Sequence, residues 1–237
     1  MSDNTSSFYK PTVATSEPIT RSKFIRKTYL HLVAAILGFV AVSTVLFYSG
    51  ISLAITNLAF STSFSWLIVM VAFIGVSYLA DSWAKNSTSK GMQYLGLSVY
   101  VVAESLVFAP LLMIAAFYAG FQLIGLAAFL TLFLTAALTF LVFFNQADFS
   151  FLRSFLALGG IISLGIIVLS LIFGFSLGLW FSGAMVLFAG AAILYDTSNV
   201  LHHYDTEQYV AASLSLFASV ALLFYYILSF LLRFTKN

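Results

Sequence analysis

Charge is scarce in this sequence, and cysteine is absent altogether. Only 8% of the 237 residues are charged, whereas 62% are hydrophobic. A typical soluble domain carries about 25% charged residues, so this chain has too few to cover a water-soluble surface. The lack of cysteine excludes disulfide bonds, thiolate metal sites and cysteine nucleophiles. The ten Lys and Arg residues are too few and too scattered for a nucleic-acid-binding surface, so we expect no nucleic-acid partner.

The apolar residues form long runs, and these indicate the fold class. Only helical bundles and closed β-barrels satisfy their backbone polar groups inside hydrocarbon. Barrel strands alternate in polarity over about ten residues, whereas the apolar runs here are much longer and do not alternate. The sequence therefore predicts an all-α integral membrane protein whose surroundings are the lipid bilayer.

Seven stretches are long enough to cross the membrane. A spanning helix needs about 20 apolar residues, and the stretches that meet this length are Thr28–Ser49, Ser63–Trp83, Met92–Tyr118, Phe121–Phe144, Phe151–Phe173, Leu177–Asn199 and Tyr209–Phe234. Only Ala119 and Gly120 separate the third and fourth, and a few residues around Gly174 separate the fifth and sixth, so both pairs are expected to be tight hairpins. We expect residues 1–22 to form a polar, flexible N-terminal tail and residues 23–237 to form a seven-helix transmembrane domain.

The positive charges predict the orientation. With seven spans, only two of the ten basic residues, Arg233 and Lys236, fall on the side opposite the N-terminus. The positive-inside rule then predicts a cytoplasmic N-terminus and a C-terminus outside. An even number of spans would bring these two charges inside as well, so the count of seven rests on the length of the last stretch, and a helical hairpin within it stays open. The loop charges and the lack of a cleavable leader favour a bacterial cytoplasmic (inner) membrane, although an organellar membrane would give a similar pattern.

Three acidic residues lie within the predicted spans. Asp81 is at the inner end of the second, where we expect a local ion pair with Lys85, four residues on. The other two lie farther inside, where an ionisable group is costly and suggests a function. Glu104 lies near the middle of the third span, six residues before Pro110. It is either a protonated carboxyl that bonds to a neighbouring helix or a functional polar site. Asp196 lies about four residues before the predicted end of the sixth span, or about 5–6 Å inside it. Burial disfavours the charged form of a carboxyl, so Asp196 is either a pH-responsive group or a solvated residue at the helix end.

Small residues line one face of the last span. Ala211, Ser215 and Ser219 recur at intervals of four, a pattern that favours close packing of one helix on another. We expect this face to pack against the sixth span, with the two serine hydroxyls reaching Asp196. The polar connection LHHYDTEQY resembles a metal site, but it is better explained as a solvated loop. The sequence has no HExxH, GxSxG or phosphate-binding motif and no second aspartate facing Asp196, so we expect neither an enzyme nor a tightly bound cofactor.

Three segments resemble the Bax-inhibitor-one family, also called the transmembrane Bax inhibitor motif family. They are FIRKTYLHL at the first span, AESLVFAPLL in the third, and GAAILYDTSNVLHHYDTEQYVAASLSLF across the sixth and seventh. The resemblance extends over nearly the whole chain. It implies seven helices with the last one central, and a pH-sensitive calcium leak. It also implies, for some bacterial relatives, restraint of a membrane-bound ATP-dependent protease.

The resemblance also reveals one departure. It implies an aspartate in the sixth helix, matched here by Asp196, paired with a second aspartate in the seventh, at the position of Ser219. Two facing carboxyls share a proton because both cannot ionise comfortably, and a serine lacks that coupling. We therefore expect weaker calcium affinity and an altered pH response. Glu104 matches an acidic residue of several family branches.

Two functions follow as expectations. The first is a passive, pH-influenced cation (calcium) leak with Asp196 at its cytoplasmic end as the metal-binding group. Ser215 and Ser219 would then be its hydroxyl partners, and Glu104 a polar site within the membrane. The second is a non-conducting regulator whose N-terminal tail binds another membrane protein, such as a membrane-bound protease.

Overall fold

The computed structural model describes residues 12–62, 65–86 and 89–235. These residues form eight α-helices, a short 3₁₀-helix and one isolated β-bridge. The helices are α1 (Pro18–Tyr48), α2 (Ile51–Ala59), α3 (Ser65–Ala84), α4 (Lys90–Ala119), α5 (Phe121–Asn145), α6 (Leu152–Phe173), α7 (Gly178–His202) and α8 (Tyr209–Phe234), and the 3₁₀-helix η1 spans Val13–Thr15. All the α-helices except α2 are long and apolar enough to cross a membrane, which makes seven candidate spans among the described residues. The prediction of a helical membrane protein is confirmed, and α8 is one continuous helix rather than a hairpin.

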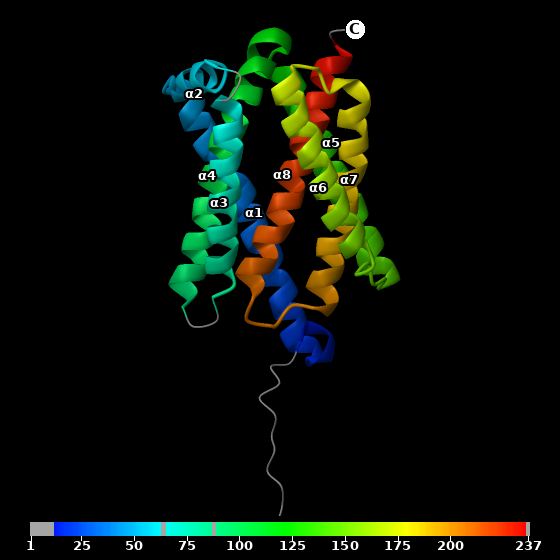
Figure 1. Ribbon diagram of the computed structural model, residues 1–237. Helices are drawn as coiled ribbons and strands as arrows, with labels where there is room; N and C mark the ends of the chain where they lie inside the picture. Colours follow the sequence, from blue (N-terminus) through cyan, green and yellow to red (C-terminus); the bar gives the residue numbers. More distant parts are fainter. Residues whose placement is uncertain (1–11, 63–64, 87–88, 236–237) are drawn as a thin grey trace, which may run out of the picture.

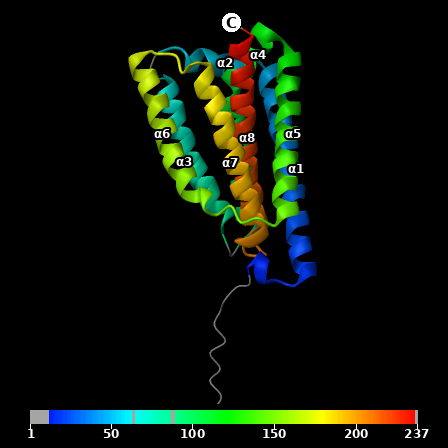
Figure 2. The same ribbon diagram turned by 90° about the vertical axis from the view of Figure 1, so that its right-hand side faces the viewer.

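The seven long helices stand side by side, and α8 lies in the middle of them (Figure 1). A view turned by 90° has α7 on one side of α8 and α5 and α1 on the other (Figure 2). Helix α8 contacts α1, α3, α4, α5 and α7. Within its most apolar window 67% of the residues are buried, against 6% for α6 at the edge of the bundle. The prediction that the last helix is central is therefore confirmed.

The first helix begins ten residues earlier than the predicted first span. Pro18 occupies its first turn, where a proline costs nothing because its missing N–H has no partner there and its φ is already helical. At 31 residues α1 is about 46 Å long, longer than the hydrocarbon core, so its basic first turns project beyond the membrane. Residues 18–22, which we expected in the tail, thus belong to α1, and Val13 is fully buried. The rest of the predicted tail, residues 1–11, lies outside the described residues.

Gly120 forms the first predicted hairpin by itself. It is the single residue between α4 and α5, and its φ of +78° lies in the left-handed region, which glycine enters without steric cost. The sequence reading missed α2, which lies at the end of the bundle opposite the N-terminus (Figure 1). Its nine residues extend only about 13 Å, too short to cross the membrane.

Candidate functional site

Asp196 lies deeper in α7 than the sequence predicted. The helix ends at His202 rather than near Asn199, because the amides of His203 and Tyr204 both donate to the Asn199 carbonyl, at 2.9 and 3.2 Å. Six residues follow Asp196 in the helix, which puts it about 9 Å inside the helix end. Its side chain is half-buried.

Ser219 of α8 is the hydrogen-bond partner of Asp196. Its hydroxyl donates to the Oδ2 atom of Asp196 at 2.5 Å, and Ser219 itself is 6% exposed. Hydroxyl-to-carboxylate bonds fall at about 2.5–2.7 Å, so this is a short contact typical of a charge-assisted bond. The predicted contact between Ser219 and Asp196 is confirmed, and it joins the two helices at the centre of the bundle.

Ser215 does not reach Asp196, which corrects that expectation. Its hydroxyl instead shares a hydrogen bond of 2.9 Å with the phenol of Tyr204, in the connection between α7 and α8. Burial raises the pKa of the Tyr204 phenol well above its usual value, and the nearby carboxyls of Asp196 and Asp81 raise it further, while the bond to Ser215 acts in the opposite direction. Tyr204 thus keeps its proton at neutral pH and lies within electrostatic range of two carboxyl groups.

Glu104 is buried in the bundle, with 7% of its surface exposed. Its partner is on its own helix, one turn earlier, where the phenol of Tyr100 donates to Oε1 at 3.1 Å. This differs from the predicted alternative, a bond to a neighbouring helix. The Tyr100 ring packs edge-on against Phe217 of α8, with 6.0 Å between ring centroids, and Tyr225 of α8 lies within electrostatic range of Glu104. Glu104 therefore lies beside the central helix.

Asp81 of α3 connects these two polar sites. Its carboxyl lies within electrostatic range of both Tyr100 and Tyr204. It also forms the predicted ion pair with Lys85, at 2.6 Å. Three carboxyl groups on three different helices thus lie near two tyrosine phenols: Tyr100 bonds to Glu104, and Asp81 is within electrostatic range of Tyr100 and of Tyr204.

The N-terminal segment covers the end of the site at Tyr204. The amide of Val13 donates to the carbonyl of Tyr204 at 2.9 Å, and Thr12 forms a β-bridge with Asp205. Phe24 of α1 packs against the Tyr204 ring, with 6.5 Å between centroids. The α7–α8 connection is therefore held in place by residues that the sequence reading had assigned to a flexible tail or to the segment just before the first span.

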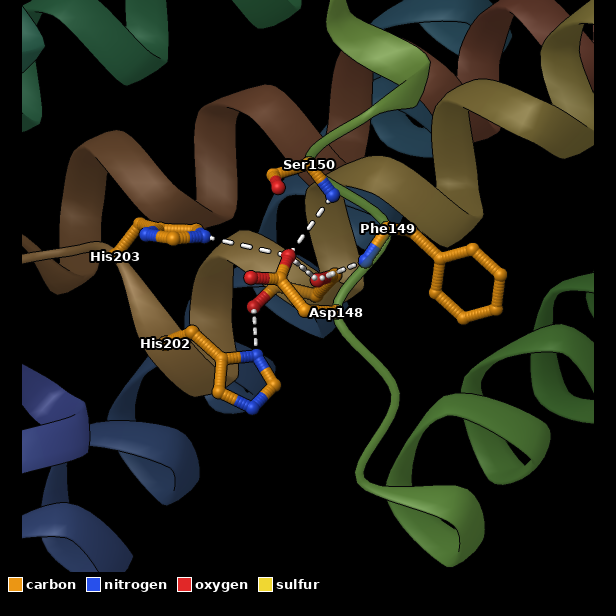
Figure 3. Close-up of polar contacts among 6 residues, drawn as sticks. Asp148, Phe149, Ser150, His202 and His203 are labelled. Atoms are coloured by element: carbon orange, nitrogen blue, oxygen red, sulfur yellow. Dashed lines mark hydrogen bonds and ion pairs between the residues drawn. The ribbon is translucent and has the colours of Figure 1, made fainter.

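A polar cluster around Asp148 ties the α5–α6 connection to the end of α7 (Figure 3). The Oδ1 atom of Asp148 accepts from the Ser150 amide at 2.8 Å and from the Ser198 hydroxyl at 3.3 Å, and lies 3.4 Å from His203 Nε2. The Ser198 hydroxyl in turn accepts from the Phe149 amide at 2.9 Å. The Ser150 amide is the main reason that the pKa of Asp148 lies below its usual value, and the Ser150 hydroxyl and His203 lower it further. Ser198 is two residues from Asp196 on α7, so this cluster fixes the same helix end.

The polar α7–α8 connection is held by pairwise contacts. His203 contacts Asp148, Glu207 pairs with Lys90 at 2.8 Å, and His202 Nδ1 lies 3.0 Å from the Ser198 carbonyl. Across residues 12–62, 65–86 and 89–235, no group of three or more His, Asp or Glu side chains could hold a metal ion. The expectation that Asp196 meets calcium stays a prediction, and any ion there would need hydroxyl or carbonyl oxygens as further ligands.

Comparison with known proteins decides the family. The family model described as inhibitor of apoptosis-promoting Bax1 matches residues 21–236, almost the whole chain. The chain belongs to the Bax inhibitor-1 family. Its membership confirms the resemblance recognised in the three sequence segments.

Relatives in this family come from plants, yeast and bacteria. The chain is 32% identical to Protein LIFEGUARD 4 of Arabidopsis thaliana, over 90% of this chain and 85% of that protein. It is 31% identical to Bax inhibitor 1 of Schizosaccharomyces pombe, over 91% and 80%. It is also 29% identical to an uncharacterized protein of Pseudomonas aeruginosa, over 66% and 69%. No solved structure matches the chain significantly.

For this Bax inhibitor-1 family member, sequence reasoning found Asp196, Ser219 and Glu104 but missed two parts of the site. Tyr204 was read only as part of a solvated loop, although an aromatic residue in a short polar connection was a signal that it packs inward. Asp148 had no local signal at all. It lies 50 residues from Ser198 and 55 from His203, and only the fold brings the three together.

Proposed function

We propose that this chain is a passive cation leak of the cytoplasmic membrane, permeable to calcium and influenced by pH, and that it acts without catalysis. The observation that carries the proposal is the Asp196 carboxyl, which is held by Ser219 at the contact between α7 and the buried α8. An ionisable group placed inside a bundle of spanning helices is costly and typically marks an ion pathway. Calcium prefers oxygen ligands such as carboxylates, hydroxyls and carbonyls, and this site offers the Asp196 carboxyl and the Ser219 hydroxyl.

The polar residues give the pathway a course. Asp196 and Tyr204 would form its cytoplasmic end, and Asp81, Tyr100 and Glu104 would continue it along α8. Protonation of a carboxyl removes the charge that attracts a cation, so acid should reduce attraction at Asp196. Tyr204, in the α7–α8 connection, lies within electrostatic range of both Asp196 and Asp81. The pH response would thus arise from single carboxyls beside phenols, in place of two facing aspartates.

We also propose the predicted orientation. The N-terminal end of the bundle carries most of the described basic residues, namely Arg21, Lys23, Arg26, Lys27, Lys85, Lys90 and Arg153, whereas Arg233 is near the C-terminal end of α8. This distribution supports a cytoplasmic N-terminus and an external C-terminus under the positive-inside rule. The membrane would be the bacterial inner membrane.

Calcium influx into dye-loaded proteoliposomes tests the proposal. The wild type and Asp196→Asn are compared, and Glu17→Gln is the matched control because it removes an equivalent charge from an exposed side chain before α1. We expect Asp196→Asn to change the influx and Glu17→Gln to retain it. Identical traces for wild type and Asp196→Asn would overturn the leak.

A regulator of a membrane-bound protease is the second proposal. It is favoured by the anchoring of Val13 and Thr12 at the α7–α8 connection. The proposed contact element is the part of the sequence before Thr12. Because Val13 is buried, the test deletion must stop at residue 11 to leave the bundle intact. Loss of a co-purifying membrane-bound protease in that deletion supports this function, and undiminished binding contradicts it.

A further inference from the structure

A groove runs between α1 and α5, and α8 forms its floor. Both outer helices pack on α8, and they lie on the same side of it in Figure 2. The groove has a volume of about 480 Å³, within the range of about 300–1,000 Å³ of known ligand sites. Its lining is mostly apolar and includes no charged residue. It includes Val40 and Thr44 of α1, Gly125 and Leu132 of α5, and Ala221 and Phe224 of α8.

Aromatic pairs join α1 and α5 above and below this gap. Phe47 meets Phe121 toward the C-terminal end of the bundle, with 5.4 Å between ring centroids, and Tyr29 meets Phe143 toward the N-terminal end, at 5.8 Å. Between the pairs the helices are held apart while small residues leave the space unfilled. A Cβ atom added to Gly125 would meet nothing within 4 Å. Atoms that line an unfilled gap lose their dispersion contacts, so an apolar molecule that enters is favoured.

One polar group in the groove has no partner. The hydroxyls of Thr44 and Thr131 donate to carbonyls of their own helices, at 2.7 Å each. The hydroxyl of Ser43, which also lines the groove, is buried and has no hydrogen-bond partner. A buried hydroxyl without a partner is costly, so a ligand that accepts its hydrogen bond would be favoured. Ser43 precedes the end of α1 at Tyr48 by five residues, or about 8 Å, which places it near the edge of the hydrocarbon region.

We propose that this groove binds one acyl chain of a bilayer glycerolipid, with the Ser43 hydroxyl donating to the ester carbonyl of that chain. The rims of the groove include exposed apolar side chains, with Val40 53% and Leu132 51% exposed, so it opens sideways where only membrane hydrocarbon reaches. The lipid comes from the leaflet at the C-terminal end of the bundle, because the unpartnered hydroxyl is toward that end. The bound chain packs on Ala221 and Phe224, on the same helix that holds Ser219.

Photocrosslinking in nanodiscs tests this assignment. The probe is a phosphatidylcholine with a diazirine in one acyl chain, and crosslinked peptides are mapped by mass spectrometry. Bulk lipid reaches only the outer faces of the helices, whereas a chain in the groove reaches α8. We expect crosslinks at Ala221 and Phe224. Gly125→Phe, which fills the groove, should reduce them at least tenfold, and Gly165→Phe, at an open position on α6, should leave them unchanged.

A second variant tests the polar contact. Ser43→Ala removes one hydrogen bond and should lower crosslinking at α8 by roughly two- to tenfold, since such a bond contributes about 0.5–1.5 kcal/mol. Wild-type crosslinks confined to the outer faces of the helices would overturn the proposal, and so would equal crosslinking in Gly125→Phe. Labelling of α8 by a diazirine fatty acid but not by the phospholipid would also overturn it, because the occupant would then not be a glycerolipid.

Discussion

The contact between Asp196 and Ser219 makes a quantitative prediction about how α7 and α8 are joined. Ser219→Ala removes the hydroxyl that donates to Asp196 at 2.5 Å. Asp196→Ala removes the acceptor. Each single variant also changes packing and solvation, so the coupling between the two sites, obtained from a double-mutant cycle, is the quantity that isolates the hydrogen bond.

The size of the coupling follows from the character of the bond. Hydrogen bonds between membrane helices contribute about 0.6 kcal/mol on average and about 1.7 kcal/mol at most. Bonds to charged groups contribute about 1.5–3 kcal/mol, more than those between neutral groups. The Ser219 bond is short, partly buried and made to a carboxyl, so we expect a coupling near the upper membrane value, about 1.5 kcal/mol.

The free energy of unfolding of the four proteins in the cycle is measured by circular dichroism during denaturant titration in mixed micelles. Ser213→Ala is the matched control, because Ser213 is also buried on α8 but donates to the Val210 carbonyl of its own helix at 2.8 Å. Its coupling to Asp196→Ala should stay below about 0.5 kcal/mol, the limit of ordinary additivity. A coupling for Ser219 that is no larger than that of Ser213 would refute the reasoning.

Three further predictions concern other parts of the bundle. Gly96→Ala should lower the melting temperature, because its Cβ would lie 2.5 Å from the Ala80 carbonyl oxygen and destabilise the α3–α4 contact by about 1–3 kcal/mol. Gly75→Ala, with open space around it, should leave the melting temperature unchanged. Asp148→Asn should speed hydrogen exchange of the Ser150 amide near neutral pH. The folded-state pKa of Asp148 lies below the usual value of 3.8, so its charge stabilises the fold above pH 3.8. That stabilisation is lost as the pH falls through the folded-state pKa. A difference in exchange from wild type that persists in strong acid would therefore contradict this prediction. Ser219→Asp creates two facing carboxyls that share a proton, so its calcium leak should depend more steeply on pH than that of the wild type. An unchanged flux–pH profile would count against proton sharing between Asp196 and position 219.

The spans and the main contact of the site could be predicted because they depend on local pattern. Hydropathy over about 20 residues located the seven long helices, and Gly120 marked the tightest turn. The four-residue spacing of small residues on α8 indicated which face meets α7 and brought Ser219 to Asp196. That spacing also led to the wrong partner for Ser215, because it identifies a helix face but not the loop residue that covers it.

The remaining features depend on contacts between distant residues. The start of α1 was missed because hydropathy does not detect the polar turns of a helix that extends beyond the membrane. Asp148 approaches Ser198 only after α5, α6 and α7 have assembled. The groove exists because α1 and α5 both pack on α8 without filling the space between them, and no single segment of the sequence records that gap.

The most direct test of the account is the ion flux of purified wild-type protein in liposomes, with calcium, potassium and protons compared over a range of pH. The account predicts a calcium leak well above that of protein-free liposomes, which falls as the carboxyls of the site are protonated and changes in Asp196→Asn. A calcium flux equal to that of protein-free liposomes at every pH would contradict it.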